Sequence, residues 1–258
     1  MKQKKLKHIT DMYYSEGKRL VAPLVGFPGV KLVGSSIKLS QQNSCEHLKV
    51  INSINERFHP DLLFPLMDLS VEANAVGRQT IILPNESATV VIEDFDIARL
   101  NTLKNIAVEY DSRLLAFTET VKKMKLHLPD SVMKGAYVTG PYTLAGLILG
   151  AENAAIKSIL DQDELKEICE FTISVILKYV ASLITSGAQL ICVLEPSAVM
   201  LGPDEFELFS ANYVKRICDY CDEKNIAAVY HICGNSSHLV NKMCEAGVDA
   251  LSLDSKEA

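Results

Sequence analysis

Short apolar runs rich in β-branched residues alternate with long amphipathic segments along most of this 258-residue chain. Such alternation is typical of strand–helix units that build a parallel sheet. The runs predict strands at 21–26, 61–67, 135–140, 188–195, 226–233 and 249–254. The segments between them predict helices at 42–58, 97–125, 162–186, 204–223 and 236–246. Two more apolar runs, joined by a Pro-Asn-Glu-Ser turn, predict a hairpin insertion at 79–94.

Repeated strand–helix units either open into a doubly wound sheet or close into a barrel of eight strands. No glycine-rich phosphate loop follows the first predicted strand, and polar residues recur at the ends of several strands. Both observations favour an α/β fold of the (β/α)8 TIM-barrel type. We expect residues 1–258 to form one incomplete barrel domain with about six of the eight strand–helix units.

Composition limits which partners the protein can bind and which cellular compartment we expect for it. A net charge of -6 and a charged fraction of 22% give no basic surface for nucleic acid. The most apolar helical stretch is interrupted by Lys178 and falls short of a membrane span. The basic start lacks the apolar stretch of a signal peptide, and seven scattered cysteines suit reduced thiols. We therefore predict a cytoplasmic protein with no nucleic-acid or membrane partner.

Polar side chains stand at the carboxyl ends of five predicted strands. In a (β/α)8 barrel these ends converge on one mouth, where catalytic groups are collected. The expected mouth residues are Asp68, Thr139, Gly140, Pro141, Glu195, His231, Cys233 and Asp254.

His231 and Cys233 are the most informative of these residues. Residues two apart on a strand point to the same face, so both side chains approach a common point. Zinc binds imidazole nitrogen and thiolate sulfur, and catalytic zinc sites commonly use three protein ligands. A histidine and a cysteine near a strand end are also common in ordinary cores. Spacing alone leaves both interpretations open.

Four segments resemble one known family. They are "DLLFPLMDLSVEANAVG" (61–77), "TGPYTLAGLILG" (139–150), "LEPSAVMLGPDEFELFSANYVKRI" (194–217) and "YHICGNSSHLVNKMCEAGVDALSLD" (230–254). The chain is similar to the uroporphyrinogen decarboxylase superfamily, in particular its methylcobamide:coenzyme M methyltransferase branch. The likeness runs from about residue 15 to the end, and its most specific part is the His-x-Cys-Gly motif.

This resemblance implies a barrel that binds zinc and moves a methyl group from a methylated corrinoid on a partner protein to an activated thiol. His231 and Cys233 would be catalytic residues and metal ligands. The acceptor would be coenzyme M or another small molecule, such as tetrahydrofolate. Side chains with substrate-binding or supporting roles would be Asp68, Glu72, Gly140, Pro141 and Asp254.

Two other functions stay open at this point. Uroporphyrinogen decarboxylases handle a polyanionic tetrapyrrole with an arginine-rich segment, whereas no arginine lies between Arg19 and Arg57 here. A degenerate barrel that binds a corrinoid protein or small ligand without catalysis is the other alternative.

The chain departs from the family at its end. Relatives continue past the sixth strand and carry a third zinc ligand, a cysteine, near the end of the barrel, whereas this chain stops at "LSLDSKEA". We therefore expect either a fragment or a homodimer that covers the open edge. Glu195, at the end of the neighbouring strand, is the candidate for the third metal ligand, because carboxylate oxygen also binds zinc.

Overall fold

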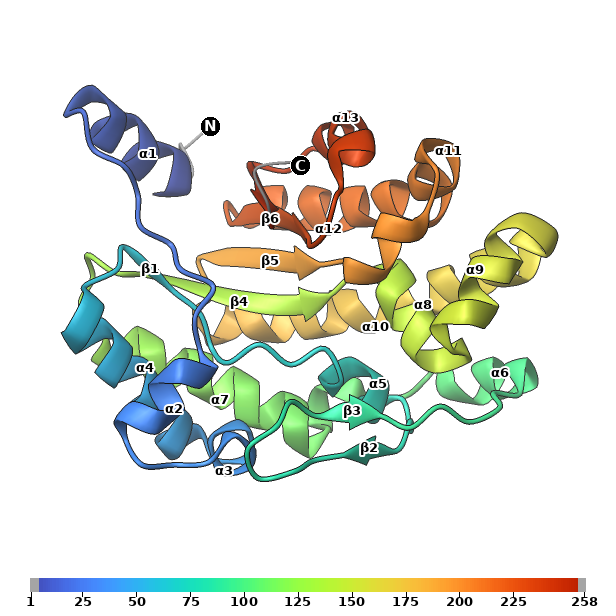
Figure 1. Cartoon of the computed structure of the whole chain (residues 1–258), viewed down its shortest axis with the longest axis horizontal. Coiled ribbons are helices and arrows are strands. Elements are labelled where there is room, and N and C mark those ends of the chain that lie inside the picture. Colours follow the sequence, from blue (N-terminus) through green and yellow to red (C-terminus); the bar gives the residue numbers. More distant parts are fainter. Residues whose placement is uncertain (1–4, 255–258) are drawn as a thin grey trace.

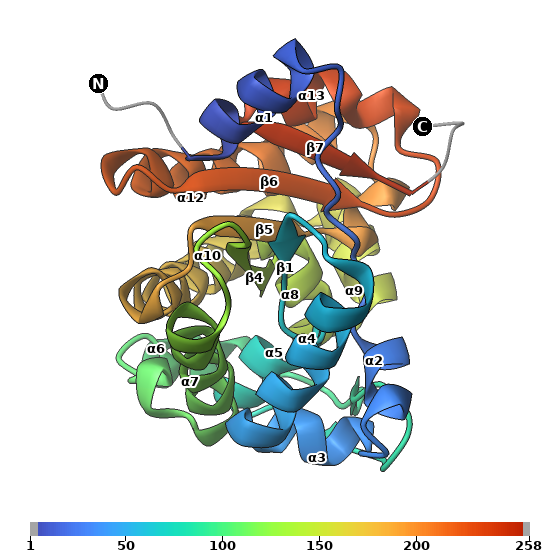
Figure 2. The same ribbon diagram turned by 90° about the vertical axis from the view of Figure 1, so that its left-hand side faces the viewer.

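A curled parallel sheet organises the computed structural model, which describes residues 5–254 (Figures 1 and 2). Its five strands stand in the order β1-β4-β5-β6-β7, and each pairs with its neighbour in parallel. The strands are β1 (Leu62–Leu63), β4 (Met133–Thr139), β5 (Leu190–Leu194), β6 (Ala227–Ile232) and β7 (Ala250–Leu253). The predicted α/β fold of the barrel type is confirmed, and it is present as a half-barrel.

The register of the ladder decides which side chains face the inside of the half-barrel. Leu194 pairs with His231, and His231 pairs with Ser252, so these three residues occupy one level on one face. Cys192 and Val229 belong to the same inner face, whereas neighbours such as Val193 pack into the helix layer. Alternation within each strand therefore separates an inner cavity wall from an outer core.

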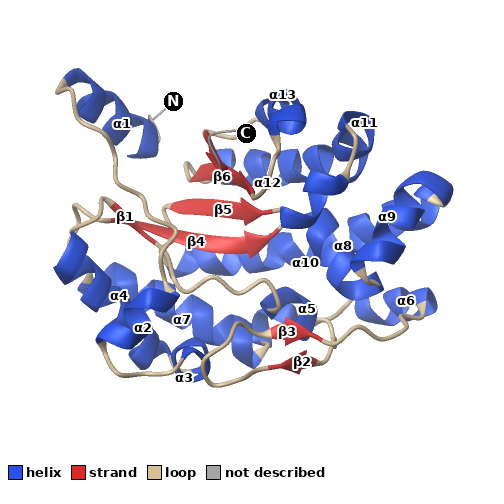
Figure 3. Ribbon diagram, viewed as in Figure 1, coloured by secondary structure: helices blue, strands red, loops and turns tan. Residues whose placement is uncertain are grey.

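Helices cover the outer face of the sheet (Figure 3). The main ones are α7 (Ser112–His127), α8 (Pro141–Leu149), α10 (Gln162–Ser186) and α12 (Asn212–Glu223). The described residues also form α2 (Phe27–Leu32), α3 (Ile37–Gln42), α4 (Ser44–Phe58), α5 (Val71–Ala75), α6 (Leu100–Leu103), α9 (Ala151–Leu160), α11 (Pro203–Phe206) and α13 (Val240–Glu245). Helix α1 (Lys5–Ser15) lies instead on the inner side of the sheet. A π-helical turn, Glu207–Ala211, joins α11 to α12.

Helix α10 shows how the apolar pattern builds this layer. Its buried positions recur every three or four residues, and Gly187 ends it in a left-handed conformation at φ 115°. Among the residues described, α10 is long and apolar enough to cross a membrane, yet 56% of its most apolar window is buried in the protein. The bent pair α8 and α9 would pass the same test only as one span, despite a bend of 111°. Burial of this kind is typical of a core helix.

Three predicted elements need correction. Residues 21–26 form no strand. Pro23 has no N–H to donate, and the backbone–backbone hydrogen bonds of this segment to β1 are confined to Val21 O, which accepts from Asp61 and Leu62 N–H. The helix predicted at 97–125 is broken, since the Asp111 side chain caps a new helix, α7. Residues 141–160, for which the sequence predicted no element, form the helices α8 and α9.

The predicted hairpin at 79–94 is present in a short form. Strands β2 (Thr80–Ile81) and β3 (Thr89–Val90) pair antiparallel as a separate two-stranded sheet. Arg78 anchors this hairpin, because its guanidinium donates to Glu93 O at 2.7 Å. The predicted single domain stays a prediction.

Candidate functional site

The carboxyl ends of β4, β5 and β6 meet at one edge of the half-barrel, as the sequence predicted (Figure 1). His231 lies on β6, and Cys233 follows the last residue of that strand. Both side chains are half-buried. Their place at the mouth is consistent with a site that a substrate can reach.

One ring nitrogen of His231 is already held. Its Nδ1 lies 3.0 Å from Ser252 Oγ and 3.1 Å from Ser252 O on the neighbouring strand β7. Burial lowers the pKa of His231, while the Ser252 carbonyl and the Asp254 charge act in the opposite direction. A neutral imidazole with Nδ1–H bound to a carbonyl leaves Nε2 as the ligating nitrogen, which is the usual arrangement at metal sites.

The turn after Cys233 depends on glycine. Gly234 has a φ of 83°, which side chains disfavour, and its N–H donates to Asp254 Oδ2 at 3.2 Å. Asp254 is exposed. Its hydrogen bond with Gly234 links the end of β7 to the turn that carries Cys233. Its predicted substrate role stays a prediction.

The predicted third metal ligand, Glu195, needs correction. Its side chain is fully buried and accepts hydrogen bonds from Thr143 N–H at 2.5 Å and Ser210 Oγ at 2.8 Å. Leu194, the residue before it, is the partner of His231 and faces inward, so Glu195 lies on the helix side of β5. Among residues 5–254, no three histidine, cysteine, aspartate or glutamate side chains form a group that could hold a metal ion.

Glu72 is a second buried carboxylate near the mouth. It accepts hydrogen bonds from Thr139 N–H at 2.7 Å and from Thr139 Oγ1 at 2.9 Å. Burial raises the pKa of Glu72 to about 7, and burial has the same effect on the pKa of Glu195. Both carboxyls therefore titrate in the neutral range rather than the acidic one.

Asp68 also bonds to protein groups. It pairs with Arg113 and accepts from Ser70 Oγ at 2.6 Å, and its side chain is 1% exposed. Neither Asp68 nor Glu72 lines the large inner cavity. Their predicted substrate-binding roles stay predictions, and the geometry gives both side chains internal partners.

Gly140 and Pro141 form the turn from β4 into α8. A Cβ atom on Gly140 would lie 2.2 Å from Glu195 Oε2, so only glycine fits against this carboxylate. Pro141 occupies the first turn of α8, where its missing N–H costs nothing. The turn is therefore built around Glu195, and substrate contacts by these two residues stay a prediction.

The sequence did not single out several residues that build the site. Ser252 is a polar residue at an inward position of β7, between Leu251 and Leu253, and this break in an apolar run was a usable signal. Ser210 and Tyr230 meet behind the strands at 2.6 Å. Nothing in their local sequence predicts this contact, because it depends on the π-helical turn.

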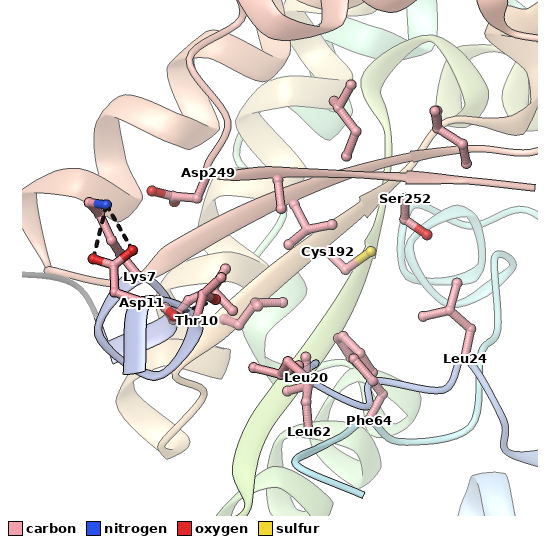
Figure 4. A pocket seen from close by; sticks show the side chains of 17 residues that line it. Lys7, Thr10, Asp11, Leu20, Leu24, Leu62, Phe64, Cys192, Asp249 and Ser252 are labelled. Carbon is pink, nitrogen blue, oxygen red and sulfur yellow. Dashed lines mark hydrogen bonds and ion pairs between the residues drawn. The ribbon is translucent and has the colours of Figure 1, made fainter. Parts of the chain in front are cut away.

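A cavity of about 620 Å³ opens along the inner face of the half-barrel (Figure 4). Its wall is mostly apolar, with Phe64, Cys192 and Leu24 on one side and the helix α1 residues Lys7 and Asp11 across from them. Ser252, which holds His231, also lines it. The cavity thus reaches Ser252, the residue that contacts the His231 ring, whereas His231 and Cys233 are not among its lining residues.

Residues 38–258 match the family model described as uroporphyrinogen decarboxylase (URO-D). The chain belongs to the URO-D family. A uroporphyrinogen decarboxylase of Prochlorococcus marinus (strain MIT 9515) is 24% identical over 237 residues, 88% of this chain and 65% of the relative. A methylcobamide:CoM methyltransferase of Methanosarcina mazei is 26% identical over 160 residues, 61% of this chain and 46% of the relative.

A solved structure, a methyltransferase from Methanosarcina mazei, has the same fold as this URO-D family chain. It superposes with a TM-score of 0.80 at 19% identity, over 92% of this chain and 72% of the other. The chain spans 65% or less of the length of the curated relatives named above. The resemblance predicted from the sequence is confirmed at the level of the family.

Proposed function

We propose that this URO-D family protein is a corrinoid-dependent methyltransferase that moves a methyl group from a methylated corrinoid to a thiol such as coenzyme M. The observation that carries the proposal is the His231–Cys233 pair at the mouth, with Nδ1 of His231 held by Ser252. Methylcobamide:CoM methyltransferase relatives from two Methanosarcina species support the same class of reaction.

The donor set fits two positions of a zinc site. Imidazole nitrogen and thiolate sulfur are the ligands that zinc prefers, and Ser252 fixes the orientation of the imidazole. Zinc, when bound, would lower the pKa of a coordinated thiol, so that the thiolate is abundant at neutral pH. Residues 5–254 contain no group of three histidine, cysteine, aspartate or glutamate side chains that could hold a metal ion, so the proposal assigns two ligands and leaves the third unassigned.

The methyl donor would be a corrinoid carried by a partner protein that docks at the mouth. The acceptor thiolate forms the new S–C bond, while the Co–C bond breaks and its electron pair stays on cobalt. Tetrahydrofolate is the alternative acceptor. A cytoplasmic location and a homodimer stay predictions that accompany this proposal.

Uroporphyrinogen decarboxylation is the second candidate, because a decarboxylase relative aligns with 88% of this chain. The distribution of positive charge argues against this candidate. Residues 20–56 contain no arginine, whereas a substrate with many carboxylates needs clustered guanidinium groups. A barrel that binds a ligand without catalysis is the remaining alternative.

Thiol-dependent demethylation of free methylcobalamin tests the proposal. Purified protein supplied with zinc should bleach the methylcobalamin spectrum in the presence of thiol, and Cys233→Ser should reduce the rate to background. Cys244→Ser is the matched control, because Cys244 is an exposed cysteine in α13. Zinc-loaded wild-type protein that leaves methylcobalamin intact would contradict the proposal, and consumption of uroporphyrinogen by the same protein would favour the second candidate.

A further inference from the structure

Glu195 is a fully buried carboxylate that the proposed reaction does not use as a ligand. It joins three elements behind the strand ends. Its Oε1 accepts from Thr143 N–H in the first turn of α8, and its Oε2 accepts from Ser210 Oγ in the π-helical turn. Its own N–H donates to His231 O at 2.9 Å. Burying such a group is costly unless its oxygens are satisfied, as they are here.

Ser210 extends this network to the strand that carries His231. Its Oγ lies 2.6 Å from Tyr230 Oη, and Tyr230 is the residue immediately before His231 on β6. The Tyr230 ring is fully buried and stacks on Phe206 at 5.9 Å between ring centroids. The outward side chain of Tyr230 is therefore fixed on the side of β6 opposite His231.

The π-helical turn explains how Ser210 reaches this place. Such turns insert one extra residue into a helix and are frequent at functional sites, because they change the direction of a side chain. Here the turn covers Glu207–Ala211, between α11 and α12, and contains Ser210. Glu195, Ser210 and Tyr230 thus form a continuous hydrogen-bonded chain from α8 to β6.

We propose that Glu195 is a positioning residue for the His231–Cys233 pair, and that it acts from the helix side through Ser210 and Tyr230. His231 lies within the sheet and pairs with Leu194 and Ser252, whereas Cys233 follows the last ladder pair, Ile232 and Leu253, so the ladder does not hold Cys233. Metal ligands and thiol-activating groups require placement to about half an ångström. This inference rests on the proposed function for its catalytic consequence, but its structural test does not.

Glu72 provides a matched comparison for this role. It is as buried as Glu195 and accepts from Thr139, on the other flank of the same β4–α8 turn. Both side-chain hydrogen bonds of Glu72 come from Thr139, and none of the hydrogen bonds among residues 5–254 joins its side chain to β6. A general effect of losing a buried carboxylate should therefore appear in both residues, and a positioning effect only in Glu195.

The test measures the imidazole nitrogens of His231 by ¹⁵N NMR in metal-free protein, alongside thiol-dependent demethylation. The variants are Glu195→Ala, Glu195→Gln, Tyr230→Phe and Glu72→Gln. Glutamine at 195 can still accept from Thr143 N–H and can donate to Ser210 Oγ, so it should restore wild-type behaviour. Tyr230→Phe removes only the hydroxyl that links Ser210 to β6.

We expect a dominant Nδ1–H tautomer of His231 in the wild type, in Glu195→Gln and in Glu72→Gln. Glu195→Ala and Tyr230→Phe should show mixed tautomers and lose about tenfold in demethylation rate. Wild-type ring signals in folded Glu195→Ala or in Tyr230→Phe would overturn the proposal, as would an equal change in the ring signals of Glu72→Gln. If Glu195→Ala does not fold, the ring signals of His231 in Tyr230→Phe test the proposal. Because the ring measurement needs neither metal nor methyl donor, failure of the proposed function would leave its result interpretable.

Discussion

Two buried carboxylates, Glu72 and Glu195, flank the turn between β4 and α8, and they differ in the part of the structure that each one contacts. Glu72 binds Thr139 on one flank, and Glu195 binds Thr143 on the other. Burial raises the pKa of each to about 7. Behind Glu72 lies a closed region around Asp68 and its ion pair. Behind Glu195 lies the strand end that carries His231.

This difference teaches that burial and hydrogen bonding alone do not reveal the role of a carboxylate. Glu72 connects two parts of the scaffold, so its loss should act on folding stability. Glu195 connects the scaffold to the candidate site, so its loss should act on the geometry of His231 as well. The following changes separate the two regions.

Removal of Arg113 should have the largest effect on stability, and it acts in the Glu72 region. Arg113 pairs with Asp68, and their side chains are 8% and 1% exposed. Arg113→Ala leaves a buried carboxylate without its cation, which should cost about 3–5 kcal/mol in urea unfolding. Arg216→Ala removes the exposed pair with Glu170 and should cost less than about 1 kcal/mol. Similar losses in both variants would contradict the buried character of the first pair.

The pH dependence of folding stability should report the raised pKa values of Glu72 and Glu195. The pKa of Glu72 is raised from 4.5 to about 7, so the folded state holds its proton more tightly than the unfolded chain. Its contribution is fully present below pH 4.5 and is lost as pH rises towards 7. The loss is on the order of 3 kcal/mol. Urea unfolding between pH 5 and pH 8 should show a smaller decline in Glu72→Gln and in Glu195→Gln than in the wild type. An unchanged decline would show that these carboxyls titrate normally.

Gly140→Ala should produce a smaller loss, confined to the Glu195 flank. The added Cβ would lie 2.2 Å from Glu195 Oε2, which forces the carboxylate or the turn to move. The expected cost is roughly 1–3 kcal/mol. Gly146→Ala, inside the helix α8 that Gly140 precedes, is the control, because its nearest new contact is 3.7 Å away. Thermal unfolding that ranks Gly146→Ala as the more damaging change would argue against this packing.

The periodicity of apolar residues was sufficient to predict an element where one face of that element is buried and the other is not. Helix α10 follows its predicted range closely, because its apolar residues repeat at three- and four-residue steps. The apolar run at 21–26 looked the same as a strand, but it lacks a ladder partner along its length. Pairing depends on distant residues, and local sequence does not contain it.

The candidate site was predicted in part for the same reason. The His-x-Cys spacing located His231 and Cys233 at a strand end, since it depends only on residues two apart. Glu195 was named from the sequence as the candidate third ligand, but the sequence could not place its side chain, because every residue of β5 is buried and the strand offers no alternation to show which face is inside. Only the register that pairs Leu194 with His231 settles it.

Metal binding by the His231–Cys233 pair is the most direct test of the account. Purified wild-type protein, incubated with zinc and dialysed, should retain about one zinc ion per chain by elemental analysis. Cys233→Ser should lose this zinc, and Cys244→Ser should keep it. Wild-type protein that retains no zinc after saturation, or a Cys233→Ser variant that retains it fully, would contradict the assignment of this pair as a metal site.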